Sequence, residues 1–318
     1  MKFGVMLPHY RQVAGTDAIA RVAREAENMG YDSVWVSDHI VVPDQDVERF
    51  GKGYYDPFSV LGYVAAITER ISLGTSIVII PLRNPLHTAQ VAATVDQLSA
   101  GRLILGVGVG SAEPEYRAMN VSWEERGSIA DEALEVLRHV WSVDRPDFQG
   151  RYFNFSEINS FPQPVQQPHP PIWIGGGSRR ALRRAAEFGD AWHPTRPSFQ
   201  LLEEGVPRLR ELAARAGREP GDIRVAARHP MKILDQSPLT SQASMSSVGT
   251  PGTWPLFDTV ERVAEGVQHF REAGVDHLVM DTFYSIPELH QETVDSVLVT
   301  MERFARYVMS QFDRDQGG

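Results

Sequence analysis

The chain has 318 residues, of which 42% are apolar and 23% charged, values typical of a globular protein with a full core. It contains no cysteine, which excludes disulfides, cysteine-ligated zinc, iron–sulfur clusters and a thiol nucleophile. The net charge of -10 argues against a nucleic-acid partner. Because the sequence has neither a long apolar run nor a signal peptide, we expect a cytoplasmic protein without a membrane partner.

The first half of the chain alternates predicted strands and helices. Apolar runs predict strands at residues 3–7, 33–36, 71–80 and 102–107. Apolar residues at helical spacing predict a helix capped by Thr16, followed by helices at 58–67, 85–98 and 124–141. The third strand, ISLGTSIVII, is too uniformly apolar for a half-exposed sheet, so we expect it to be buried on both faces.

The second half continues the alternation after an aromatic- and proline-rich stretch at 148–170, which predicts a hairpin and an extended arm. Further strands are predicted at 172–174, 191–192, 223–228 and 277–281. Helices are predicted to end at Gly189 and to span 201–216, 260–273 and 288–309. A stretch rich in serine, threonine, proline and glycine at 231–257 predicts a mobile lid.

Strands that alternate with helices in this way predict a (β/α)8 TIM barrel with insertion loops, forming one domain over residues 1–318. A doubly wound sheet would need edge strands, and none is evident. Active sites of such barrels lie at the C-terminal ends of the strands, and the arm at 148–170 falls on the opposite, stabilising face. The candidate site residues are therefore Pro8, His9, Asp38, His39, Ser76, Gly108 to Ser111, Gly175 to Ser178, His193, Arg228, His229 and Asp281.

The segment PIWIGGGSRRALRRAAEFGDAWHP at 171–194 predicts an anion site between a strand and a helix. Its glycines would expose backbone N–H groups, and Ser178 is a natural N-cap. Four arginines at 179, 180, 183 and 184 crowd the first turns, where a bound anion would offset their conflict with the helix dipole. A plain turn with a solvated basic face is the alternative. The G-x-G-x-x-G spacing is absent, so we expect a phosphorylated ligand other than NAD.

Other strand ends offer room for a flat ligand and groups for proton transfer. Glycines alternate at 106, 108 and 110, which leaves one face of that strand end without side chains. Asp38 and His39 are adjacent at a strand end and could form an acid/base pair. Histidines at strand ends could instead bind a metal, but no pair has the i, i+4 spacing of a ligand motif, and we expect no metal. No core lysine, Walker loop or nucleophilic triad is present, so a cofactor is expected to perform the difficult step.

The chain resembles the bacterial luciferase-like monooxygenase superfamily, and more closely its coenzyme F420-dependent oxidoreductases. The matching segments are FGVMLP at 3–8, GYDSVWVSDH at 30–39, ISLGTSIVIIPLRNP at 71–85, DQLSAGRLILGVGVG at 96–110 and PVQQPHPPIWIGGGSRRALRRAAEFGDAW at 164–192. The set is specific for the superfamily and much less so for the choice of flavin.

The resemblance implies a flavin or deazaflavin over the barrel mouth, with a non-proline cis peptide at Ser76–Ile77 behind the ring. It implies that Asp38 and His39 are the catalytic residues. The implied cofactor contacts are Ser76, Ile77, Val109 and Gly110 near the ring, and Gly175, Gly176, Gly177, Ser178 and Arg179 at the phosphate.

Two positions depart from the deazaflavin dehydrogenases of this group, which carry a tryptophan four residues after the histidine and a glutamate after the glycine that matches Gly110. Here these positions are Pro43 and Ser111, and the candidates for the missing acid are Glu113 and Glu115. We expect a homodimeric oxidoreductase that uses coenzyme F420 to transfer a hydride to or from a small organic substrate. The alternatives are an FMN-dependent monooxygenase, a non-catalytic flavin-binding protein and a flavin-free isomerase or aldolase.

Overall fold

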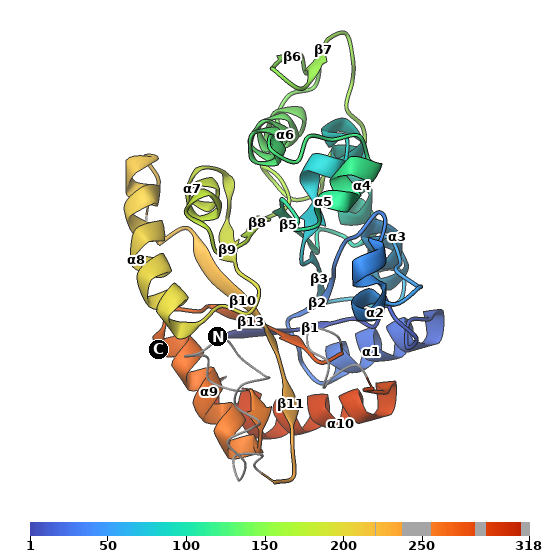
Figure 1. Ribbon diagram of the computed structural model, residues 1–318, viewed down its shortest axis with the longest axis vertical. Coiled ribbons are helices and arrows are strands. Elements are labelled where there is room, and N and C mark those ends of the chain that lie inside the picture. Colours follow the sequence, from blue (N-terminus) through green and yellow to red (C-terminus); the bar gives the residue numbers. More distant parts are fainter. Residues whose placement is uncertain (220, 237–255, 284–290, 313–318) are drawn as a thin grey trace.

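The computed structural model describes residues 1–219, 221–236, 256–283 and 291–312 (Figure 1). In these residues one sheet of parallel strands closes into a barrel, which confirms the predicted (β/α)8 fold. The barrel strands are β1 (Lys2–Met6), β2 (Ser33–Val36), β3 (Ser72–Thr75) with β4 (Val78–Ile79), β5 (Leu103–Gly108), β8 (Ile172–Gly175), β9 (Ala191–His193), β10 (Arg224–Pro230) and β13 (His277–Asp281).

A helix follows each barrel strand and packs outside it, so the strands are enclosed by helices (Figure 1). These helices are α1 (Thr16–Asn28), α3 (Pro57–Ala65), α4 (Pro85–Leu98), α6 (Arg126–Val140), α7 (Arg179–Phe188), α8 (Phe199–Arg215), α9 (Val260–Glu272) and α10 (Val294–Phe304). Among the described residues, no helix combines the length and apolar character that a membrane span requires.

Shorter elements lie in the connections between strands and helices. A hairpin of β6 (Phe148–Gln149) and β7 (Asn154–Phe155) follows α6, as predicted, and β11 (Lys232–Ile233) pairs with β12 (Phe257–Asp258). The short helices are α2 (Val47–Phe50), α5 (Glu113–Ala118) and, after a π-helical turn at Ala305–Met309, α11 (Ser310–Phe312). Most of the predicted lid at 231–257 and the predicted start of the last helix at residue 288 lie outside the described residues.

The barrel closes where β3 pairs with β5, with Leu73 opposite Leu103. The sequence predicted one continuous strand at 71–80, but the structure divides it into β3 and β4. The interruption falls at Ser76–Ile77, whose peptide bond is cis, as the resemblance implied. The strand is otherwise almost completely buried, as its apolar sequence predicted.

The middle of the barrel is a packed core. The rings of Trp35 and Trp173 lie 4.8 Å apart, and both side chains are almost fully buried. Glycines on neighbouring strands make room for Trp35, because a Cβ atom at Gly4 would come within 2.4 Å of it and one at Gly74 within 2.2 Å. Since side chains fill the interior at this level, a ligand can enter only from an open end of the barrel.

Several of the outer helices begin at a residue whose side chain accepts a hydrogen bond from an amide of the first turn. Ser178 caps α7, as predicted, because its Oγ accepts a hydrogen bond of 3.2 Å from the amide of Ala181. The predicted cap at Thr16 is wrong by one residue. The carbonyl of Gly15 accepts the first helical hydrogen bond, from the amide of Ile19 at 3.0 Å, so Gly15 is the cap and Thr16 is the first helical residue.

Candidate active site

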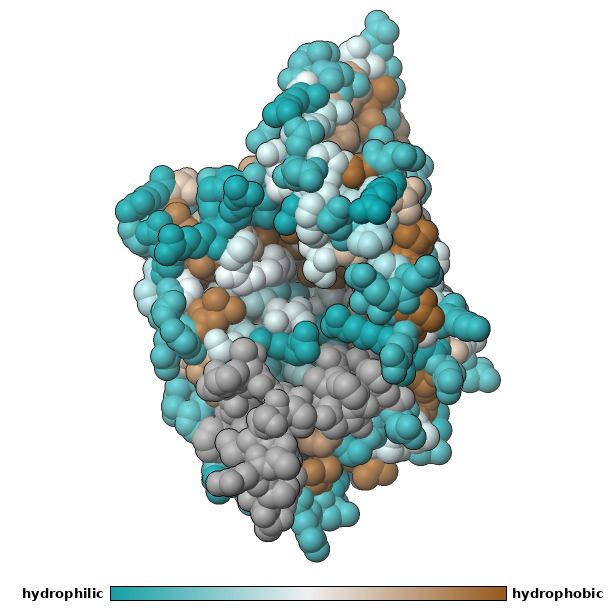
Figure 2. Space-filling view, viewed as in Figure 1, coloured by the Kyte–Doolittle hydropathy of each residue, from teal (hydrophilic) through white to brown (hydrophobic). Residues whose placement is uncertain are grey.

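The parallel barrel brings the predicted site residues to one end. Asp38 and His39 follow β2, Ser76–Ile77 separates β3 from β4, Val109–Gly110 follows β5, and Gly175 ends β8. In Figure 2 the visible face is hollowed near its centre, beside α2 and α5, which also follow barrel strands (compare Figure 1). These residues therefore share the C-terminal mouth, where barrel enzymes hold their active sites.

Ile77 forms part of the wall of this mouth, and two glycines make its position possible. A Cβ atom at Gly108 would come within 2.9 Å of the Ile77 side chain, and one at Gly175 within 2.8 Å. Ser76, beside it, is buried, with its Oγ 2.8 Å from Nε2 of His193 and its carbonyl accepting a 2.9 Å bond from Nη1 of Arg228. Ser76 is thus held by His193 and Arg228, and Ile77 packs against the space left by Gly108 and Gly175.

Val109 and Gly110 form the next stretch of the wall. Gly110 has φ +63°, a conformation that side-chain-bearing residues rarely adopt, and an added Cβ would come within 3.0 Å of Ile79. The carbonyl of Val109 accepts a 2.5 Å hydrogen bond from the hydroxyl of Tyr116, which is buried. Backbone conformation and the small space therefore favour glycine here, and the hydrogen bond from Tyr116 anchors the loop after β5.

The triple-glycine corner opens to solvent at the start of α7. Gly176, Gly177 and Ser178 are exposed, and Gly176 has φ +100°. The nearest atom to a Cβ added at Gly176 is the Cβ of Ala181, at 3.4 Å, so the space outside the corner is open. The first amides of a helix have no carbonyl partner within the helix and can bind an anion. The corner thus has the backbone geometry of a phosphate site.

The arginines behind this corner do not all face it. Arg184 is buried, and its Nε contacts a carboxylate oxygen of Asp131 on α6 at 2.6 Å. Arg183 also pairs with Asp131. The predicted cluster of four cations therefore divides: Arg183 and Arg184 join α7 to α6, and Arg179 and Arg180 remain exposed beside the glycines. Side chains three or four residues apart share one face of a helix, so successive residues point in different directions. Arg183 and Arg184 therefore face α6 rather than the glycine loop.

His39 lies in a hydrogen-bonded pair with Glu115 of α5. Nδ1 of His39 is 2.9 Å from Oε2 of Glu115, and the Glu115 side chain is only 1% exposed. Its other oxygen, Oε1, accepts a 2.7 Å bond from the amide of Ile40. Of the two glutamates suggested by the sequence, the structure brings Glu115 to the site, whereas Glu113 is half exposed and pairs with Arg117 on the surface. The spacing alone could not decide between them.

Asp38, next in the chain, faces a different set of partners. Its carboxylate is fully buried and receives two bonds from the guanidinium of Arg83, at 3.0 and 2.7 Å. The amide of Ile79 donates a further bond of 3.0 Å to the same group. Asp38 thus ties the end of β2 to the segment after β4, and Arg83 is a site residue that the sequence did not reveal.

The other histidines at strand ends are buried and neutral. Burial lowers the pKa of His9 and of His229 to about 4, and that of His193 to about 3. Nδ1 of His9 donates to the carbonyl of Leu7 at 2.8 Å, which is a structural contact. Among the described residues, no group of three or more histidine, aspartate and glutamate side chains is arranged to hold a metal ion.

A buried ion pair supports the same end of the barrel from β10 and β13. Nε of Arg228 contacts Oδ2 of Asp281 at 2.9 Å, and both side chains are buried. Burial alone would lower the pKa of Arg228, but the neighbouring carboxylate of Asp281 raises it above its usual value. Arg228 therefore stays charged and holds the carbonyl of Ser76 in place.

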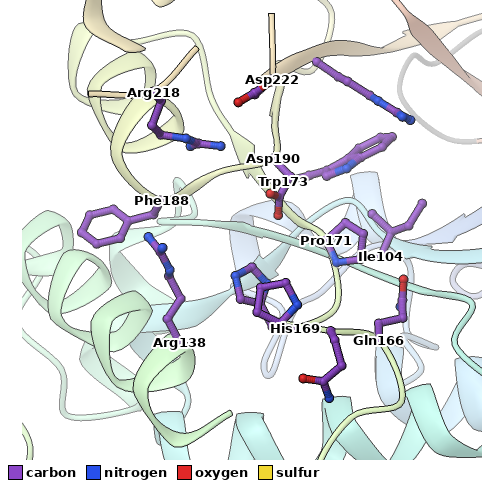
Figure 3. Close-up of a pocket in the computed structure, with 13 residues that line it drawn as sticks. Ile104, Arg138, Gln166, His169, Pro171, Trp173, Phe188, Asp190, Arg218 and Asp222 are labelled. Atoms are coloured by element: carbon purple, nitrogen blue, oxygen red, sulfur yellow. The ribbon is translucent and has the colours of Figure 1, made fainter. Parts of the chain in front are cut away.

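A separate crevice of about 510 Å³ lies at the N-terminal end of the barrel (Figure 3). Arg138 and Arg218 flank Phe188 there, and both donate to carbonyls at the C-terminal end of α7; Nη1 of Arg218 is 2.6 Å from the carbonyl of Gly189. Gln166, at the end of the arm at 148–170, donates to the carbonyl of Leu103 at 2.8 Å. Arg138 and Arg218 thus cap the C-terminal end of α7, and the stabilising role of this face stays a prediction.

The structure is a closed (β/α)8 barrel whose candidate residues gather at the C-terminal ends of the strands, where enzymes of this fold hold their active sites. Sequence comparison narrows this class. The family model described as luciferase-like monooxygenase matches residues 1–238, and the chain belongs to this family. Its relatives include F420-dependent dehydrogenases and monooxygenases, so the protein is an oxidoreductase.

Relatives with named activities and similar solved structures match most of the chain. The F420-dependent glucose-6-phosphate dehydrogenase of Kineococcus radiotolerans is 32% identical over 296 residues, which cover 82% of this chain and 86% of the relative. The structure of riboflavin lyase (RcaE) with modified FMN and riboflavin has a TM-score of 0.80 and 18% identity, and the match covers 99% of this chain and 91% of that one. An F420-dependent secondary alcohol dehydrogenase with an F420–acetone adduct has a TM-score of 0.76 and 20% identity, with 97% and 98% covered. At these identities the two structures show the shared fold.

Proposed function

We propose that this protein is a coenzyme F420-dependent oxidoreductase that transfers a hydride between the deazaflavin and a small organic substrate. The observation that carries the proposal is the His39–Glu115 pair at the barrel mouth. Moving a hydride to or from a carbon that bears oxygen requires a group that gives or takes the proton of that oxygen. The F420-dependent relative at 32% identity supports the same choice of cofactor.

The residues at the mouth fit such a cofactor. The glycine corner at Gly175 to Ser178, which is open outside Gly176, would hold the phosphate through backbone amides, with Arg179 beside it as a cation. Ser76, Ile77, Val109 and Gly110 would lie along the ring, where Ile77 supplies an apolar surface. When bound, oxidised F420 supplies a hydride acceptor, and the reduced form a hydride donor.

His39 would act on the substrate proton. Because its Nδ1 is taken by Glu115, Nε2 is the nitrogen that would take a proton from a substrate hydroxyl, or return it to a carbonyl in the reverse direction. Asp38 would hold the end of β2, next to His39, in place, since its carboxylate is fully buried in an ion pair with Arg83. Ordinary general acid–base catalysis of this kind contributes about 10²- to 10⁴-fold.

An FMN-dependent monooxygenase is the second candidate. It is favoured by the riboflavin lyase structure, which contains modified FMN and has a TM-score of 0.80 with this chain. Pro43 and Ser111, at the positions where the deazaflavin dehydrogenases carry tryptophan and glutamate, also leave this candidate open. The cofactor therefore has to be decided by binding.

Titration of the purified protein with F420 and, separately, with FMN tests the proposal. We expect F420 to bind and FMN to bind far more weakly, and we expect a homodimer by light scattering of the same preparation. A panel of alcohols is then screened for loss of the absorbance of oxidised F420. His39→Gln should leave F420 binding unchanged and reduce turnover by about 10²- to 10⁴-fold. Tight FMN binding without F420 binding would favour the monooxygenase instead.

A further inference from the structure

We propose that Glu115 is a positioning residue that keeps neutral His39 in a single tautomer, with the proton on Nδ1 and the lone pair on Nε2. The tautomer itself follows from contacts within the chain. Its consequence for turnover rests on the proposed function, in which Nε2 of His39 exchanges a proton with the substrate.

The hydrogen bond between the two side chains has one possible direction when the histidine is neutral. An ionised carboxylate can only accept hydrogen bonds, so at 2.9 Å from Oε2 of Glu115 the Nδ1 of His39 must be the donor. A neutral imidazole has one proton, and Nε2 is then an acceptor. The carboxylate oxygen thus decides which nitrogen of His39 can take a proton.

The carboxylate is itself held in a fixed position. Oε1 of Glu115 accepts bonds from the amides of Ile40 at 2.7 Å and Val41 at 3.4 Å. The side chain is only 1% exposed and projects from α5, so it has little freedom to rotate away from His39. Because it is buried beneath the histidine, Glu115 acts on a substrate through His39 rather than by contact.

The ring of His39 is oriented by packing as well as by this bond. It lies 4.5 Å from the ring of Phe50 at the end of α2 and 5.2 Å from that of Tyr54, measured between centroids. Its side chain is 13% exposed, so one edge reaches the mouth. Tyr54 is kept neutral by burial, which raises its pKa, and Asp38 is paired with Arg83. Within the described part of the chain, Glu115 is the charged group that contacts the imidazole.

A purely structural role would be that Glu115 only anchors the loop after β2 through the two amides. The substitution Glu115→Gln separates the roles. The carboxamide oxygen can still accept from Ile40, but its NH2 group would face Nδ1 of His39 and donate to it. The proton of His39 would then move to Nε2, which would abolish the acceptor at the mouth while keeping the loop anchored.

The matched control is Glu113→Gln. Glu113 lies on the same short helix, makes the same change of charge when substituted, and is 52% exposed in a surface pair with Arg117 at 3.2 Å. It has no bond to His39. Both variants and the wild type are prepared without cofactor and checked for folding by thermal unfolding.

Nitrogen-15 NMR of the histidine side chains reads the tautomer directly, and a His39→Gln variant assigns the His39 signals among the 10 histidines. We expect the Nδ1–H tautomer in the wild type and in Glu113→Gln, and the Nε2–H tautomer in Glu115→Gln. A wild-type His39 protonated on Nε2 overturns the proposal, even if Glu115→Gln fails to fold. An unchanged tautomer in folded Glu115→Gln overturns it as well.

Turnover supplies the second measurement, once F420 binding has been established by titration. We expect Glu115→Gln to reduce kcat by about 10²- to 10⁴-fold with the affinity for F420 unchanged, and Glu113→Gln to alter neither. Full activity in folded Glu115→Gln would mean that the residue is only an anchor. The NMR result does not depend on the cofactor, so failure of the proposed function leaves the test of the tautomer intact.

Discussion

At the scale of single residues, the buried ion pair of Arg228 and Asp281 stabilises the barrel and the backbone of its mouth. The pair joins β10 to β13, and Arg228 also donates to the carbonyl of Ser76 at the mouth. Removing one partner leaves the other charge buried without its counter-ion, and such changes cost about 3–5 kcal/mol.

Asp281→Asn should therefore lower the free energy of unfolding by about 3–5 kcal/mol at neutral pH, measured by urea denaturation. Asp295→Asn is the control, because Asp295 pairs with Arg21 at 2.6 Å on the surface with both side chains more than half exposed. We expect about 0–1 kcal/mol for the control. Equal losses for the two variants would show that burial does not govern the strength of the Arg228 pair.

The triple-glycine corner is the clearest case at the scale of an element. Gly176 combines φ +100° with open space outside the backbone, so a side chain there would stand where a phosphate should approach the helix amides. The same substitution also strains the backbone, and the two effects have to be measured separately.

Gly176→Val should weaken F420 binding by at least about 10-fold and lower stability by about 1–3 kcal/mol through backbone strain. Gly217→Val is the control, since Gly217 has φ +73°, lies after α8 and has no atom near its added Cβ. The control should lose similar stability and bind F420 normally, as measured by titration and thermal unfolding. Unchanged binding in Gly176→Val would place the phosphate elsewhere.

The elements themselves were largely predictable because each depends on a local pattern. Short apolar runs predicted the barrel strands, and Ser178 before a run of helix formers predicted the start of α7. The sequence predicted one continuous strand at 71–80 and missed the break between β3 and β4, although the resemblance implied the cis peptide at which the break falls. The spacing of apolar residues reveals helices and strands because each element buries particular faces, and the residues on a buried face recur at a fixed interval.

The contacts that build the site were much harder to predict, because they join residues far apart in the chain. Asp38 and Arg83 are separated by 45 positions, Arg228 and Asp281 by 53, and His39 and Glu115 by 76. No local pattern encodes such pairs, which form only when the barrel closes. The sequence named Glu113 and Glu115 together, and only the orientation of α5 separates them. The single domain and the homodimer remain predictions.

At the scale of the whole molecule, the buried histidines make stability depend on pH. Burial lowers the pKa of His9 and His229 to about 4 and that of His193 to about 3, whereas an unfolded chain titrates histidine near 6.5. Between these values the unfolded state binds more protons than the folded state. The contribution of these histidines to the free energy of unfolding is therefore fully present above about pH 6.5 and is lost as the pH drops toward 4.

Each buried histidine should contribute a slope of up to about 1.4 kcal/mol per pH unit in that range, measured by urea denaturation from pH 7 to pH 4. His229→Asn removes one titrating group, and the amide nitrogen of asparagine can replace the Nδ1 donor that lies 2.9 Å from the carbonyl of Pro230. The pH slope of its unfolding free energy should be smaller than that of the wild type by up to about 1.4 kcal/mol per pH unit. His87→Asn, on the exposed side of α4, should leave the slope unchanged. Equal slopes for the wild type and His229→Asn would mean that His229 binds protons equally in the folded and unfolded states, which contradicts a lowered pKa at the barrel end.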